Sequence, residues 1–519
     1  MNIFRLPVAA TLDAVGRFIR AGDGADKVMS IGTDVINKVS ADSLRKFMDG
    51  LSSALNRLSP NVLLHSLGQV TRTVLSAIVK KVGQLNVVRD GVMSNKLNEL
   101  TISFLWTQRH ELVNFIVDIV ECAKCYVKAT SLDGQRDPLE EHGTDNELDI
   151  SMPMNQHALL CQAQRLVKSL VYLFTNVAEP LSFEEIDMSA RTQLATDTFH
   201  SGTTIEVTPS GSQTVSAISD TPAKGRRRDS GVGEPDITMS EHSESSPNVA
   251  SGDGNDNKAT ITDEKWLFVN GVGTELFWLH LACRKLAKRF SRDVTGVYNR
   301  GDGILWDLIE CAGQRTRYGY RCAESQKCMV QTTASSRAAQ ISLVNQLEDA
   351  LVKAEDGATY KYVVVVAHSQ GCLVLRLALE QLLKSSSESL QKVMQERLCV
   401  FTFGNPSVEW KIGSAQVLRT EHFANEKDFV AKLGVMYDDK QTERGFTNVF
   451  VNKEKEWTGH LFGTQYSLKP QHYTDGFQVK GSNRSWLLNC LEGESIDVAR
   501  VRFVLSHPNY ARKADECIV

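Results

Sequence analysis

One stretch of the chain, residues 361–383 with the sequence KYVVVVAHSQGCLVLRLALEQLL, restricts the possible folds more than any other. Residues 362–367 form a nearly continuous apolar run, which is typical of a strand that is buried on both faces. The residues that follow Ser369 have the apolar spacing of a helix. A buried strand that passes directly into a helix is typical of a parallel sheet covered by helices. Ser369 stands where the two predicted elements meet.

The alternation of strand and helix patterns continues over residues 262–519. Apolar runs predict strands at residues 265–271, 293–299, 360–367, 397–406, 417–423 and 446–452. Helical spacing is found at residues 274–290, 336–354 and 371–383. We therefore predict an α/β domain over residues 262–519, with a mostly parallel sheet and helices on both faces. Such sheets place their chemistry at the carboxyl ends of the strands.

The rest of the chain divides into two parts by composition. Apolar residues in residues 1–182 recur every three or four positions, which predicts a helical N-terminal module. Residues 183–261 are rich in Ser, Thr, Gly and Asp and contain few aromatic residues. Such a segment buries too little apolar surface to offset the entropy lost on ordering, so we predict a disordered linker.

One short motif within the predicted linker has a regulatory interpretation. Three arginines, Arg226, Arg227 and Arg228, stand just before Ser230, and this spacing resembles a basophilic kinase site. A phosphate on Ser230 would partly cancel the basic cluster. The alternative is a solvated charge cluster without regulation, because short motifs match by chance.

Composition limits the classes of function. The chain has 519 residues and a net charge of only −4, whereas a dedicated nucleic-acid binder usually has a basic domain. We therefore expect no nucleic-acid partner. The eleven cysteines are scattered, which is typical of reduced thiols in an intracellular protein. Neither Cys122 with Cys125 nor Cys322 with Cys328 has the further ligands that a zinc site needs, and no metal is expected.

The expected location is intracellular and cytoplasmic, since the sequence contains no uncharged apolar segment of ~18 residues. Arg5, Arg17 and Arg20 lie among apolar residues and leave a mitochondrial leader helix as an alternative. The N-terminal helices are mildly basic, so they also suit a peripheral membrane surface or a protein partner.

The residues around Ser369 predict a sharp turn. Ala367-His368-Ser369-Gln370-Gly371 matches the pattern small-x-Ser-x-small, with Ala where the commonest version has Gly. Small flanking residues are needed because larger side chains would collide with the neighbouring strand and helix. The turn holds the Ser oxygen above the sheet at a helix N-terminus.

A serine hydroxyl becomes a nucleophile when a base takes its proton and an acid orients that base. In this kind of turn the chain order is Ser, then the acid, then His. Asp428 is the predicted acid, because it follows a strand and precedes the apolar pair Phe429 and Val430. The competing carboxyl groups are Glu426, Asp438 and Asp439.

The predicted base is His460, which follows the last predicted strand. Gly459 before it permits close approach of the backbone, and Leu461 and Phe462 after it are suited to packing the loop down. His472 is the alternative base, and His507 is a lesser one. His368 and His422 are interpreted as packing or hydrogen-bonding residues.

An oxyanion hole needs backbone N–H donors near the serine. One predicted donor is Gln370, directly after Ser369, and the loop after the strand at residues 265–271 supplies Gly271 and Val272. The same loop does not fit a dinucleotide fingerprint, because Leu276 stands where a small residue is expected.

These motifs together resemble the α/β-hydrolase superfamily, specifically the lipase/serine-esterase-like proteins of filamentous fungi. The resemblance covers residues 262–519 and rests on FVNGVGTELFWLH, GVYNRGDGILWDLIECAGQR, VVVVAHSQG, FTFGNPSVEW, EHFANEKDFVAKLGV and GHLFGTQYSL, in that order. It implies a nucleophile at Ser369, an acid at Asp428 and a base at His460.

The expected function is that of a serine hydrolase that cleaves a carboxylic ester, with an ester or lipid substrate and no cofactor. The same residues also suit a thioesterase or an amidase. A further alternative is a catalytically idle hydrolase fold that acts as a scaffold through the N-terminal module.

Overall fold

The fold is known from a computed structural model. It describes residues 200–216, 263–301, 304–312, 330–331, 333–355, 360–438, 441–454, 459–474 and 484–498, together with residues 145, 147, 149, 152, 154, 155, 158, 161 and 162. Most of the N-terminal module and of the linker lie outside the described residues. The same is true of Ser230, Asp439 and His507, and of the cysteines at 122, 125, 322 and 328.

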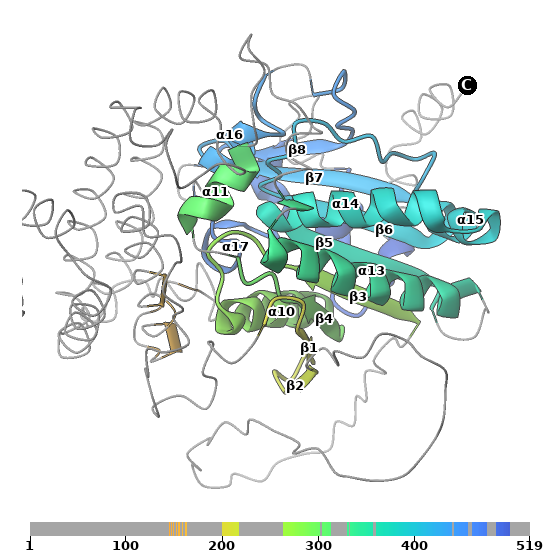
Figure 1. Ribbon diagram of the computed structural model, residues 1–519, viewed down its shortest axis with the longest axis horizontal. Coiled ribbons are helices and arrows are strands. Elements are labelled where there is room, and N and C mark those ends of the chain that lie inside the picture. The colour runs from red at the N-terminus through yellow and green to blue at the C-terminus, as the bar shows by residue number, and fades with distance from the viewer. Residues whose placement is uncertain are drawn as a thin grey trace, which may run out of the picture.

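A nine-stranded sheet with the order β2-β1-β4-β3-β5-β6-β7-β8-β9 is the centre of the described structure (Figure 1). The strands are β1 (Thr204–Val207), β2 (Gln213–Ser216), β3 (Glu264–Val269), β4 (Val294–Val297), β5 (Tyr362–His368), β6 (Leu398–Phe403), β7 (Arg419–Asn425), β8 (Val449–Asn452) and β9 (Tyr473–Thr474). The six strands from β4 to β8 pair in parallel, and β1, β2 and β9 pair antiparallel at the two edges. The prediction of a mostly parallel α/β sheet is confirmed.

Helices lie on both faces of this sheet. They are α10 (Leu276–Phe290), α11 (Ile304–Ala312), α13 (Ala334–Glu355), α14 (Gln370–Ser385), α15 (Glu388–Arg397), α16 (Phe429–Leu433), α17 (Phe462–Gln465) and α18 (Trp486–Asn489). Strand β5 shows why two layers form. Val363 and Val365 join one core cluster with α13 and α14, whereas Val364 and Val366 join the other with α10 and α18. Side chains that alternate along a strand thus require cover on each face.

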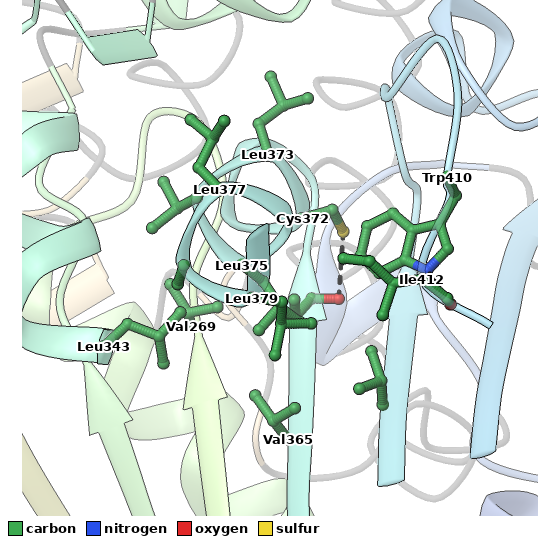
Figure 2. Packing of buried hydrophobic residues seen from close by; sticks show 14 of the residues in the cluster. Val269, Leu343, Val365, Cys372, Leu373, Leu375, Leu377, Leu379, Trp410 and Ile412 are labelled. Carbon is green, nitrogen blue, oxygen red and sulfur yellow. Dashed lines mark hydrogen bonds between the residues drawn. The ribbon is translucent and has the colours of Figure 1, made fainter. Parts of the chain in front are cut away.

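Helix α14 is held on the sheet by its apolar side chains. Figure 2 shows Leu375 and Leu379 of α14 beside Val269 and Val365 of the sheet, with Leu343 of α13 close by. All five residues are fully buried. Because α14 begins directly after β5, this packing also fixes the turn that contains Ser369.

The linker prediction is wrong for residues 204–216. These residues form the hairpin of β1 and β2, and β1 extends the sheet by pairing with β4. The β-branched residues Ile205 and Val207 are buried, and Gly211 provides a positive φ of 88° in the turn. The low aromatic content of this segment favoured disorder in the prediction. The hairpin is nevertheless stable because β1 pairs with the edge strand β4 of the sheet.

Part of the N-terminal region also contacts the sheet domain. Ala158 is buried against Phe277, Trp278 and Leu281 of α10. The Trp278 indole N–H donates to Asn155 Oδ1 at 2.9 Å. In the part of the chain that is described, no helix has the length and apolar character that crossing a membrane requires.

Candidate functional site

The turn between β5 and α14 holds Ser369 in a strained conformation. Its φ is 58° and its ψ is −129°, a region that non-glycine residues rarely adopt. The Ser369 N–H donates to the carbonyl of Phe403 on the neighbouring strand at 2.8 Å. A Cβ at Gly271 would overlap the Ser369 side chain, and a Cβ at Gly371 would overlap the backbone of β3. Both glycines therefore allow the turn to fit against β3 and the loop that follows it.

His460 lies within hydrogen-bond distance of this serine. Its Nε2 is 2.7 Å from Ser369 Oγ, and its Nδ1 is 2.8 Å from Asp428 Oδ2. A carboxylate only accepts hydrogen bonds, so Nδ1–H donates to Asp428 and Nε2 accepts a hydrogen bond from the Ser369 hydroxyl. The structure thus joins the three residues in one hydrogen-bonded chain.

Asp428 is fixed by two further donors. The Val430 N–H donates to Oδ1 at 2.8 Å, and the Tyr466 hydroxyl donates to Oδ2 at 2.6 Å. Burial and the Asp428 charge raise the pKa of Tyr466 well above its ordinary value of 10, which keeps the phenol a donor. Gly404 has a φ of 59°, and a Cβ there would lie 2.8 Å from Asp428 Oδ2. No pattern in the sequence had indicated Tyr466.

The loop that contains His460 is fixed from several sides. Asn425 at the end of β7 donates to the carbonyls of Gly459 and Gln465 at 2.7 and 2.9 Å. Gln465 Oε1 accepts the Leu461 N–H at 3.0 Å. His368 Nε2 lies 2.7 Å from the carbonyl oxygen of His460, so it donates there. Burial lowers the pKa of His368 well below its ordinary value, and the nearby His460 adds to the shift, so His368 is neutral.

Two of the predicted oxyanion donors, Gln370 and Gly271, lie beside the serine. Gln370 is the first residue of α14, where backbone N–H groups have no partner within the helix. Gly271 contacts Ser369 closely, as its missing Cβ shows, and Val272 is partly buried against the core. The next N–H along, that of Gly273, donates to Asp307 Oδ2 at 2.8 Å. This bond helps to set the course of the loop after β3.

A buried polar cluster holds the side chain of Gln370. Its amide Nε2 donates to Glu310 Oε2 on α11 at 2.7 Å, and its Oε1 accepts from Asn299 Nδ2 at 2.8 Å. Glu310 also accepts the hydroxyls of Thr333 and Ser336. Glu310 is 2 % exposed and was not among the predicted site residues. Its charge in an apolar stretch, ILWDLIECA, was the only available signal.

The alternative candidates have other partners. His472 Nδ1 is 2.7 Å from Ser467 Oγ, and Asp438 forms an ion pair with Arg444 at 3.1 Å. Glu426 is exposed. His422 Nδ1 is 2.6 Å from Thr402 Oγ1, in keeping with a packing role. None of these side chains takes the position that His460 or Asp428 occupies next to Ser369.

The three hydrogen-bonded residues are shielded from water. Ser369 and Asp428 have no exposed surface, and His460 is 2 % exposed. Low-dielectric surroundings strengthen the bonds between them. Across the described residues, no group of three or more His, Cys, Asp or Glu side chains is arranged to hold a metal ion.

Comparisons of the chain with protein-family models, with curated proteins and with solved structures found no match. The resemblance to lipase/serine-esterase-like proteins therefore stays a prediction that depends on the motifs alone.

Proposed function

We propose that the chain is a serine hydrolase that cleaves carboxylic esters, with lipid esters among its substrates. One observation carries the proposal: Asp428, His460 and Ser369 form a continuous hydrogen-bonded chain with distances of 2.8 and 2.7 Å. This arrangement gives a serine hydroxyl both a base and an orienting acid. We also propose the α/β-hydrolase fold, because Ser369 follows a central parallel strand and its partners follow later strands in the order Ser, Asp, His.

In the proposed reaction, Ser369 Oγ attacks the acyl carbon while His460 Nε2 takes the hydroxyl proton. The carbonyl oxygen gains negative charge as the tetrahedral intermediate forms. His460 then gives the proton to the leaving alcohol, and the acyl group stays on Ser369. Water attacks the acyl-enzyme by the same steps and releases the acid. Asp428 holds the imidazole in the required tautomer and stabilises its charged form.

The backbone N–H of Gln370 is the first donor proposed for the intermediate's oxygen. The second comes from the loop of Gly271 and Val272. Donors that are fixed before the reaction stabilise developing charge without reorganisation, and losing one costs roughly 100- to 1,000-fold in rate. Since Ser369 has no exposed surface, a substrate must displace part of the covering protein before its carbonyl reaches Oγ.

The test compares the full-length protein with its Ser369→Ala variant. We expect the wild type to be labelled by a fluorophosphonate probe and to hydrolyse p-nitrophenyl esters, and the variant to lose both properties. Ser389→Ala is the matched control, because Ser389 is exposed on α15. Labelling that persists in Ser369→Ala would contradict the assignment of Ser369 as the nucleophile.

The same protein and probe also test two alternatives, a thioesterase or amidase activity and a catalytically idle scaffold. A panel of esters, thioesters and amides of matched chain length ranks the three substrate classes by kcat/KM, and the proposal requires the esters to rank first. A wild-type protein that is inert towards the panel and silent towards the probe would favour the catalytically idle scaffold instead.

A further inference from the structure

Glu147, from the N-terminal region, binds the segment directly after His460. Its Oε1 accepts the Gly463 N–H at 2.7 Å, and its Oε2 accepts the Thr464 N–H and hydroxyl at 2.8 and 2.7 Å. Both Glu147 and Thr464 are buried, at 4 % and 1 % exposure. One carboxylate thus satisfies three donors at the start of α17.

Lys285 of α10 holds the same segment from its carbonyl side. Its Nζ donates to the carbonyls of Phe462, Gly463 and Tyr466 at 2.8, 2.8 and 2.6 Å. Desolvation lowers the pKa of Lys285 to about 8, while Glu147 and Asp145 oppose this shift. The Glu147 carboxylate thus binds N–H and hydroxyl donors of residues 462–466, and the Lys285 ammonium binds backbone carbonyls of the same segment.

Glu147 reaches this position because the chain around it is docked on α10. The docked segment comprises the described residues between 145 and 162. Asp145 forms an ion pair with Arg284, and Gln162 Nε2 donates to Glu275 Oε1 at 2.6 Å. Apolar contacts of Ala158 with α10 add to these bonds. The segment is therefore held at both of its ends.

We propose that Glu147 is a positioning residue for His460, and that the docked segment is a structural part of the catalytic unit. The inference rests on the proposed function, in which His460 is the base. Gly463 lies only three positions after His460, so a shift of α17 moves the imidazole relative to Ser369. A misplacement of about 1 Å at reacting groups costs roughly 100-fold in rate.

The packing around Gly463 supports this role. A Cβ at Gly463 would lie 2.6 Å from Glu147 Oε2 and would also overlap the backbone carbonyl of Asp145. Glycine at this position therefore lets the docked segment approach α17 closely. Replacing Gly463 by Ala disturbs the same contact without changing any charge.

The test uses the full-length protein and the Glu147→Gln variant. Gln keeps the size of Glu but turns an NH₂ group towards one of the donors, so α17 loses part of its support. We expect kcat to fall roughly 10- to 100-fold while KM stays nearly unchanged. Gly463→Ala is expected to give the same split between kcat and KM. Glu396→Gln is the matched control, because Glu396 is exposed on α15 and forms an i,i+4 ion pair with Lys392.

Two further measurements separate positioning from general stability. In a double-mutant cycle with Thr464→Val, the losses in kcat should be less than additive, because both changes remove the same contact. Asp145→Asn should lower stability without an equal loss in kcat, since the Asp145 side chain bonds Arg284 and Lys288 of α10, whereas the Glu147 side chain bonds α17. A Glu147→Gln protein with wild-type kcat would overturn the proposal, as would additive losses.

Hydrogen exchange of the backbone amides of residues 459–466 tests the proposal without any measurement of activity, so it does not depend on the proposed function. If the wild-type protein neither turns over esters nor binds the probe, the proposed function fails and exchange alone decides. Faster exchange at Gly463 and Thr464 in Glu147→Gln supports the positioning role, and unchanged exchange overturns it.

Discussion

At the scale of single residues, the site combines strain with close contact. Ser369 takes a positive φ of 58° although it has a side chain, and Gly271 touches it where any Cβ would overlap. Strain of this kind persists only where the surroundings enforce it. Here the enforcing elements are the packing of α14 and the bond from the Ser369 N–H to Phe403.

This strain predicts a difference between two variants that both lack the hydroxyl. Ser369→Gly removes the strained Cβ, a relief of about 1–2 kcal/mol, whereas Ser369→Ala keeps it. The greater freedom of glycine in the unfolded chain offsets about 0.4–1 kcal/mol. We expect Ser369→Gly to exceed Ser369→Ala by roughly 0.5–1 kcal/mol in the free energy of unfolding. Parallel urea titrations measure this difference, and an Ala variant that is equally stable would contradict it.

At the scale of elements, the Glu310 carboxylate connects α11 to the turn that contains Ser369. Glu310 of α11 bonds Gln370 at the start of α14 and the hydroxyls of Thr333 and Ser336 near the start of α13. The group thus fixes three helices around the residue whose N–H is the proposed oxyanion donor. Nothing in the spacing of the sequence indicated this cluster. Its members come from four separate segments, which contain Asn299, Glu310, Thr333 with Ser336, and Gln370.

Glu310→Gln tests the importance of this connection. Its NH₂ group would face one of the buried donors, and an unsatisfied buried donor costs about 1–3 kcal/mol. We expect a loss of unfolding free energy of that size, together with a lower kcat in ester hydrolysis. Urea denaturation and steady-state kinetics measure the two effects. Glu348→Gln, at an exposed position of α13, is the control. Wild-type stability and activity in Glu310→Gln would show that the cluster is dispensable.

Elements with strong local patterns were predictable from the sequence, and elements that depend on distant partners were not. The apolar run of β5 and the helical spacing of α14 are local, and both elements formed as expected. The chain order of serine, acid and histidine led to Asp428 and His460, which form one hydrogen-bonded chain with Ser369, while their catalytic roles remain predictions. The hairpin of β1 and β2 was missed, because it is stabilised by β4 and not by its own composition.

At the scale of the whole molecule, buried histidines affect the response to acid. Burial lowers the pKa of His422 to about 3, and burial with the nearby Arg284 lowers that of His280 to about 4. Between these values and the ordinary 6.5, the unfolded chain binds protons that the folded chain does not. The stability that these two neutral histidines contribute is therefore complete above about pH 6.5, and it is lost progressively as the pH falls towards their folded-state pKa values.

His422→Asn is expected to reduce this pH dependence. Asn retains a polar atom near Thr402 Oγ1 but does not titrate, so the slope contributed by His422, about 1.4 kcal/mol per pH unit, should disappear. Urea denaturation of the wild type and the variant at about pH 6, 5 and 4 measures the slopes. The comparison uses slopes, so a constant loss from the smaller side chain does not affect it. Equal slopes in the two proteins would mean that His422 binds a proton in the folded state.

The contact between Glu147 and α17 has a consequence for how the protein is made. The bonded residues are 316 and 317 positions apart in the chain. A ribosome therefore releases the docked segment long before the residues that it will hold, and contacts of such high sequence separation form late in folding. Ser369 also emerges before His460. A chain still under synthesis thus contains Ser369 before His460, and the contact between them forms only after both segments have left the ribosome.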